Sequence, residues 1–255
     1  EQVPQSFQIK FSVDNMASRM NYHLAIILEG ELILCPQSEH SFRFITAYSS
    51  PIEGLDSPLY RTSLEGMAPK WGLDHDTTQI LEYMACMTAH IHSYMGGGVP
   101  EFGREPWDLR LGQIQRMLES EPSVAWSQNA SPDFSIYECC RLTAIVYCKA
   151  IINYEPFSVA CSPDDLDRIY SIMSLVPITR WMQISGVWLW MLCIVNPAAR
   201  YRLEGLRFRL LLKDCAGALG LIDWQILVNC MERFLSIMSW IREKGRRPPT
   251  EVNAV

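Results

Sequence analysis

The chain has 255 residues, of which 49% are hydrophobic and 20% are charged, and its formal net charge at pH 7 is −6. A globular chain of this length buries about 70–75% of the surface that its unfolded form exposes, so it needs no metal ion or disulfide to fold. The negative net charge argues against a nucleic-acid-binding surface, because phosphate binding requires clustered Lys and Arg side chains.

The first 70 residues carry few regular patterns. Residues 24–34 form an apolar run broken by Gly30, which is consistent with the end of a helix or with a hairpin. Residues 36–69 are rich in Ser, Pro and Gly, and this composition predicts a long irregular connection. We therefore expect residues 1–70 to form a helical and irregular portion that packs on a helical domain of residues 71–245. Residues 246–255 are expected to form a flexible tail.

Helical periodicity dominates from about residue 71. Asp76 is expected to cap a helix, with Gln79 three residues later. The apolar side chains that follow on one helical face are Ile80, Met84, Met87, Ile91 and Met95. The glycines at 96–98 are expected to end this helix. A shorter amphipathic helix is expected from Pro106 to Leu118.

The next helices have clear start signals. Ser131–Pro132 and Ser162–Pro163 each place a capping side chain directly before a proline at the first helical position. The second of these helices is expected to continue to Pro177. Residues 180–196 are apolar almost all round and therefore predict one central helix.

Two further helices are expected toward the C-terminus. Residues 200–219 predict one, with Gly220 just beyond its end. Asp223 is expected to cap the last, long helix, whose apolar face carries Ile226, Cys230, Phe234, Ile237 and Ile241. Because strands and helices do not alternate in this pattern, the expected fold is all-α, a single multi-helix domain with a largely irregular N-terminal portion.

The cysteines indicate reduced thiols inside the cell. Their number is odd, no C-x-x-C pair occurs, and most of them fall within apolar helical patterns. Such cysteines behave as small core hydrophobes in a cytosolic or nuclear protein. The nine are Cys35, Cys86, Cys139, Cys140, Cys148, Cys161, Cys193, Cys215 and Cys230.

Common catalytic signatures are missing from the sequence. It contains no G-x-S-x-G elbow, P-loop or H-E-x-x-H motif. Asp164, Asp165 and Asp167 resemble a magnesium-binding D-D-x-x-D motif, but the fifth position is Arg168. These carboxylates directly follow a capping serine and a proline, where they complement the positive end of a helix. We therefore expect no metal site and no cofactor.

Large aromatic side chains and methionines gather in the last two-fifths of the chain. Flat rings and flexible thioethers can line a cavity for an apolar ligand, although core packing alone also accounts for each of them. Trp188 and Trp190 cannot lie on the same face of a helix, so at most one of them lines such a pocket. The candidate ligand-binding residues are Trp181, Met182, Trp188, Met191, Met231, Phe234 and Met238.

Several segments resemble one known family. Residues 137–147, Y-E-C-C-R-L-T-A-I-V-Y, are similar to the helix Y-E-A-C-R-L-A-A-L-I-Y of the second large class of fungal-specific transcription factor regulatory domains. Residues 181–199, with G-V-W-L-W and then P-A-A, resemble that family's P-G-x-L-L-W helix and the break after it. Residues 209–240 and 76–87 resemble two further family segments, so the likeness covers about residues 59–240.

The resemblance implies a helical regulatory domain that, in the family, lies C-terminal to a binuclear zinc cluster of six closely spaced cysteines. Sterol-responsive members bind ergosterol in this domain and often dimerise through it. The present sequence has no zinc-cluster motif, and Ser185 stands where the family usually has proline. The resemblance therefore implies a sensor that makes no direct contact with nucleic acid.

Three functions remain open from the sequence. The resemblance favours a ligand-responsive regulatory domain in the nucleus or cytoplasm, which binds an apolar sterol- or terpenoid-like molecule, forms a homodimer, or does both. An alternative is a stand-alone protein of secondary metabolism, a cofactor-independent cyclase or pericyclase that holds a terpenoid- or polyketide-like substrate in a reactive conformer. The third is a dimerisation or scaffold module without a pocket.

Overall fold

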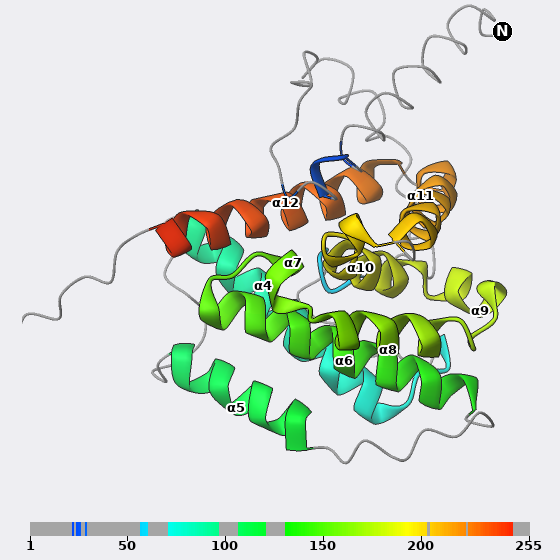
Figure 1. Ribbon diagram of the computed structural model, residues 1–255, viewed down its shortest axis with the longest axis horizontal. Coiled ribbons are helices and arrows are strands. Elements are labelled where there is room, and N and C mark those ends of the chain that lie inside the picture. The colour runs from blue at the N-terminus through cyan, green and yellow to red at the C-terminus, as the bar shows by residue number, and fades with distance from the viewer. Residues whose placement is uncertain are drawn as a thin grey trace, which may run out of the picture.

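The computed structural model describes residues 22, 24–26, 29, 57–60, 71–96, 107–120, 131–202, 205–222 and 224–246. These residues contain helices and no strand, which confirms the all-α expectation (Figure 1). Their helical elements are α4 (His75–Met95), α5 (Trp107–Ser120), α6 (Pro132–Asn153), α7 (Phe157–Ala160), α8 (Pro163–Met173), α9 (Ile178–Gln183), α10 (Ser185–Val195), the 3₁₀ helix η1 (Ala198–Tyr201), α11 (Gly205–Ile222) and α12 (Trp224–Arg246).

Two helices occupy the centre of the molecule. α6 contacts α4, α5, α7, α8, α10 and α12, and α10 contacts α6, α7, α9 and α11. All 11 residues of α10 are buried, as expected for a helix that is apolar all round. Around this pair, α12 crosses one side, α5 lies on the opposite side, and α9 and α11 lie at one end (Figure 1).

The expected starts of α6 and α8 are confirmed. The Ser131 side chain accepts a hydrogen bond from the Phe134 N–H at 3.2 Å, and Pro132 is the first helical residue. At α8, Ser162 Oγ accepts from the Asp165 N–H at 3.1 Å while Asp165 Oδ2 accepts from the Ser162 N–H at 3.2 Å. This reciprocal pair is a capping box, so Asp165 has the capping role expected for it.

The start of α4 differs from the expectation. Asp74, not Asp76, is the capping residue, because its backbone is extended and its side chain accepts from the Thr77 N–H at 2.6 Å. Asp76 lies in the first turn, where its negative charge complements the helix dipole. The expected end is confirmed, since α4 stops at Met95 and Gly96 follows as its C-cap.

The single helix expected over residues 180–196 is wrong. The structure has two helices, α9 and α10, separated at Ile184, whose φ of −119° and ψ of 40° are not helical. The break lets α9 remain partly at the surface, with Ile178 52% exposed, while α10 enters the core. Because both halves are rich in apolar residues, composition could not reveal the break.

The end of α11 also differs from the expectation, because the helix continues through Gly220 to Ile222. Its start depends on a glycine: a Cβ on Gly205 would lie 1.7 Å from the carbonyl oxygen of Ala199 in η1. On α12 the expected apolar face is confirmed for Cys230, Phe234, Ile237 and Ile241, which are all buried, and Ile226 is partly buried.

Several of the expected features concern residues that the structure does not describe. Asp223, most of residues 24–34 and 36–69, and residues 247–255 lie outside the described residues. Within the first 70 residues, Tyr22, Ala25, Ile26 and Leu59 belong to the buried core. None of the described helices combines the length and the apolar character that crossing a membrane requires.

Candidate functional site

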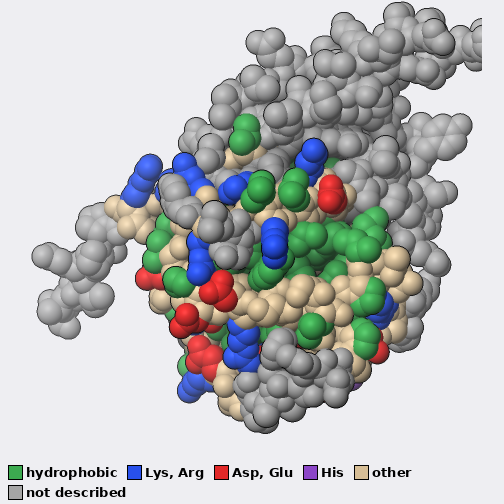
Figure 2. Space-filling view, turned by 45° about the vertical axis from the view of Figure 1, so that its right-hand side comes forward, with side chains coloured by type: hydrophobic (Ala, Val, Ile, Leu, Met, Phe, Trp, Pro, Cys, Tyr) green, Lys and Arg blue, Asp and Glu red, His purple; other side chains and the backbone are tan. Residues whose placement is uncertain are grey.

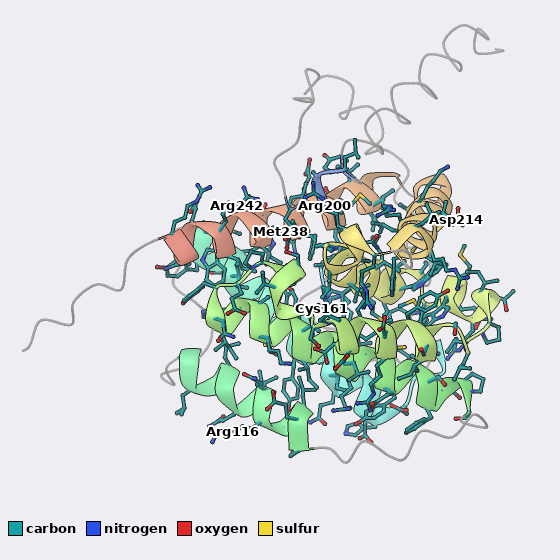
Figure 3. All side chains as sticks on the ribbon, viewed as in Figure 1. Arg116, Cys161, Arg200, Asp214, Met238 and Arg242 are labelled. Atoms are coloured by element: carbon teal, nitrogen blue, oxygen red, sulfur yellow. The ribbon has the colours of Figure 1, made fainter. Side chains whose placement is uncertain are left out.

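The seven candidate ligand-binding residues lie on three helices. Trp181 and Met182 lie on α9, Trp188 and Met191 on α10, and the other three on α12. All are buried except Met182, which is 37% exposed at the surface of α9. The buried six share one core cluster, in which Met238 lies on the inner side of α12 (Figure 3). Whether these residues bind a ligand stays a prediction.

Trp181 of α9 and Trp188 of α10 form a stacked pair. The rings of Trp181 and Trp188 are 6.3 Å apart with an angle of 16° between their planes. Trp181 Nε1–H donates to the Met173 carbonyl oxygen at 3.1 Å, which ties α9 to the end of α8. The Nε1–H of Trp188, by contrast, is buried without a hydrogen-bond partner among the described residues. An unpaired buried donor is costly, and an acceptor atom on a ligand would relieve that cost.

Both rings of this pair are buried, at 2% and 0% exposure, although α9 also carries exposed residues. Arg180 holds the helix in place, because its Nη2 donates to the Gly72 carbonyl oxygen at 3.0 Å and lies 3.5 Å from Asp133 Oδ1. Figure 2 turns the end that carries α9 and α11 toward the reader, and hydrophobic side chains line a hollow on this face. The exposed hydrophobic residues of the two helices are Ile178, Met182, Leu206 and Leu210.

Two of the remaining candidates, Phe234 and Met191, pack against an aromatic ring and a sulfur atom. Phe234 stacks on Phe157 of α7 at 5.2 Å, and Phe157 stacks on Tyr147 of α6 at 5.9 Å. Trp190 meets Tyr147 edge to face at 6.2 Å, so it points away from Trp188 as their two-residue spacing predicted. Met191 Sδ lies 3.9 Å from the Cys140 thiol. These contacts connect α12, α7, α6 and α10 through the core.

The segment 137–147 contains a buried network of charges. Arg141 donates to both carboxylate oxygens of Glu138, at 2.7 and 2.9 Å, and to the Leu118 carbonyl oxygen at the end of α5 at 2.6 Å. Arg168 of α8 reaches the same carboxylate at 2.6 Å. The network therefore joins three helices, and both Glu138 and Arg141 are only 4% exposed.

The same segment also supplies an uncharged polar contact. Tyr147 lies 2.8 Å from the Thr88 hydroxyl, which itself donates to the Met84 carbonyl oxygen within α4. Since the single hydroxyl hydrogen of Thr88 is used in that bond, Tyr147 is the donor of the pair. Burial raises the pKa of Tyr147, so its ring stays neutral at physiological pH. α4 and α6 are thus joined by a fully buried hydrogen bond.

The cysteines of the described residues have no disulfide partners. Burial raises the pKa of the thiols of Cys139, Cys193 and Cys215, which therefore remain protonated and unreactive. Among the aspartates of the D-D-x-D segment, Asp167 forms an ion pair with Arg202 at 3.0 Å. Nowhere in the described ranges do three or more His, Cys, Asp or Glu side chains come together as metal ligands would.

A polar cleft, which we call the α12 cleft, was not expected from the sequence. It has a volume of about 400 Å³ and lies between the end of α4, the turn at residues 57–60 and the middle of α12. Its lining residues are Tyr60, His92, Asn229, Glu232, Arg233 and Ser236. The four on α12 are separated by three, one and three residues, so they lie on one face of the helix and mark a polar stripe there.

No family model, curated protein or solved structure matches the chain.

Proposed function

We propose that this chain is the ligand-responsive regulatory domain of a fungal zinc-cluster transcription factor, which binds an apolar small molecule and does not itself contact DNA. The observation that carries the proposal is the placement of the family-like segment 137–147. Its two charged residues, Glu138 and Arg141, form the buried network that joins α5, α6 and α8. The charged residues of this segment therefore have a structural role, because they join three helices in the core. This role supports the inference that the segment is characteristic of the family's fold.

The place that best fits a site for a small-molecule effector is where α9 packs on α10. The stacked pair Trp181 and Trp188 offers a flat apolar surface, and the Trp188 Nε1–H can donate to one oxygen of an apolar molecule. Because both rings are buried, binding there requires α9, which carries Trp181, to move outward so that the two rings separate. An effector that prefers the moved position shifts the population toward it, and the surface presented by α9 and α11 to other proteins changes.

The test is binding of ergosterol to the purified chain, followed by tryptophan fluorescence and native mass spectrometry. Trp188→Phe removes the N–H while it retains a ring, and we expect binding to weaken about fivefold, the worth of one hydrogen bond. Trp190→Phe is the matched control, because Trp190 is equally buried on the same helix and also has an unpaired N–H. It packs on Tyr147, away from α9, so its substitution should leave ergosterol binding unchanged.

Two results would contradict the proposal. The first is equal weakening in Trp188→Phe and Trp190→Phe, which would show that both act only through the core. The second is the absence of any bound apolar molecule, either added or co-purified from a fungal host. The homodimer that the resemblance implies stays a prediction, and sedimentation of the purified chain would test it.

A further inference from the structure

The α12 cleft carries two opposite charges that the protein only partly satisfies. Glu232 Oε1 accepts a hydrogen bond from the Tyr22 hydroxyl at 2.7 Å. Glu232 is exposed, and among the described residues no second partner reaches its other carboxylate oxygen, which is accessible from the cleft. Burial and this bond to Glu232 raise the pKa of Tyr22, so the phenol remains a hydrogen-bond donor.

Arg233 also lines the cleft and is bonded to the turn at residues 57–60. Its Nη1 donates to the carbonyl oxygens of Leu59 and Tyr60, at 3.3 and 3.2 Å. These two bonds use one nitrogen of the guanidinium group. Within the part of the chain that the structure describes, the Nη2 and Nε hydrogens remain for a second partner. A guanidinium group fixed in this way suits a carboxylate, which it can bind through two parallel hydrogen bonds.

His92 lines the same cleft as a neutral ring. Burial and the positive charge of Arg233 lower its pKa from 6.5 to about 4, and a contact with the Arg233 backbone offsets part of that effect. Its Nε2 is enclosed and has no hydrogen-bond partner among the described residues. Since the ring is uncharged at neutral pH, the cleft presents one cation, one anion and several neutral polar groups.

We infer that the α12 cleft binds a small zwitterion of the α-amino-acid class, with its carboxylate at Arg233 and its ammonium group at Glu232. A simple anion would meet the Glu232 carboxylate, and a simple cation would meet the Arg233 guanidinium. An apolar molecule would desolvate both charges without pairing either. The volume of about 400 Å³ also lies within the range of small-molecule sites, about 300–1,000 Å³. This inference is independent of the apolar effector proposed at α9.

The first experiment is a thermal-shift screen of the whole chain with each common L-α-amino acid at about 10 mM, since binding to the folded state raises Tm. At least one amino acid should raise Tm, and its removal by dialysis should reverse the shift. If every amino acid leaves Tm unchanged, the inference is wrong. If glucose or glycerol raises Tm as much as the best amino acid does, the cleft recognises hydroxyl groups and the inference is equally wrong.

The second experiment separates the two charges of the ligand. For L-glutamine, the analogue without the ammonium group is glutaramate, and the analogue without the carboxylate is 4-aminobutanamide. Corresponding pairs exist for whichever amino acid binds. Calorimetry should show each analogue binding at least about tenfold more weakly than the parent amino acid, because each leaves one charge of the cleft unpaired.

Variants of the cleft assign each charge to its partner. In Glu232→Gln, which keeps an acceptor for Tyr22, the ammonium group should no longer improve binding. The gain in affinity from the ligand's carboxylate should be smaller in Arg233→Lys, which keeps the positive charge. It should be smaller still in Arg233→Gln, which removes that charge. Glu243→Gln and Arg246→Gln are matched controls, because both residues are exposed on the same helix outside the cleft. If the controls weaken binding as much as the cleft variants do, the amino acid binds elsewhere.

His92 gives a readout that a stability defect would not produce. A carboxylate bound at Arg233 offsets the positive charge that lowers the pKa of His92, so the pKa should rise from about 4 when the amino acid binds. NMR titration of the His92 ring protons measures this change in the unmodified chain. A pKa of His92 that is the same with and without the bound amino acid would overturn the assignment of the carboxylate to Arg233.

Discussion

α9 and α10 are neighbours in the sequence, yet the molecule encloses only one of them. Every residue of α10 is buried, whereas α9 exposes Ile178 and Met182 and is attached through Trp181 and Arg180. The α12 cleft is a second region at the surface of the molecule, and it carries charged groups where α9 carries apolar ones. We therefore propose ligand sites at these two places, beside α9 and in the α12 cleft.

Several polar groups of the centre are paired inside the protein. Glu138 is bonded by two arginines, and Tyr147 donates to Thr88. Trp188 and Trp190 of α10, and His92 beside the α12 cleft, each have a nitrogen without a hydrogen-bond partner among the described residues. Buried polar groups normally find partners, so an exception near a surface is a reason to look for a ligand. The contrast between centre and edge can be tested by four measurements.

The largest effect is expected at the centre. Trp190→Ala removes a fully buried ring from α10 and its contact with Tyr147, so the free energy of unfolding should fall by about 3–5 kcal/mol. Met182→Ala at the α9 edge should change it by no more than about 0.5 kcal/mol. Urea unfolding measures both, and similar losses in the two variants would remove the distinction between centre and edge.

The second largest loss in the free energy of unfolding is expected when the buried network of Glu138 and Arg141 is disrupted. Glu138→Ala leaves Arg141 buried without its carboxylate, and we expect a loss of about 3 kcal/mol in the free energy of unfolding. The double variant Glu138→Ala/Arg141→Ala should lose less than the sum of the two single variants, because the charges depend on each other. Strict additivity in urea unfolding would show that the network does not act as a unit.

Acid pH should destabilise the protein through the cleft edge. The folded pKa of His92, about 4, lies below its ordinary value of 6.5, so the unfolded chain binds a proton more readily between these values. Stability should therefore fall as pH drops from about 6.5 toward 4. Burial also lowers the pKa of His90, which contributes in the same direction. His92→Gln should reduce the pH slope, and an unchanged slope would contradict the altered pKa of His92.

The smallest effect on global stability is expected at the attachment of α9. Arg180→Ala removes its contacts with Gly72 and Asp133, and should cost less than about 1 kcal/mol in unfolding, as exposed pairs do. Hydrogen exchange should nevertheless become faster in α9 and stay unchanged in α10, because local opening reports the attachment of one element. Faster exchange in both helices would show that they open together.

Sequence patterns predicted the helical elements best where a local signal marks an end. The Ser–Pro starts of α6 and α8 and the glycine end of α4 are of this kind, because capping involves residues within one turn. The cap of α4 was misplaced by two residues, since Asp74 and Asp76 both satisfy the composition rule. The break at Ile184 was missed because it lies inside an apolar run and follows from the burial of α10 beside an exposed α9.

The candidate sites divide in the same way. Trp181 and Trp188 were singled out by residue type, but only the structure pairs their rings and shows Met182 at the surface. The α12 cleft was missed altogether, although the spacing of Asn229, Glu232 and Arg233 marks a polar stripe. His92 and Tyr60 join that stripe from distant parts of the chain, and no local pattern connects them.

By itself, the sequence determined the all-α class, the caps of α6 and α8 and the apolar face of α12, because these follow from interactions within a few turns. The tertiary structure alone decided that α6 and α10 form the centre and that α9 separates from α10. It also decided which polar groups are paired and which remain available. Those outcomes depend on contacts between residues far apart in the chain, and the packing of whole helices selects them.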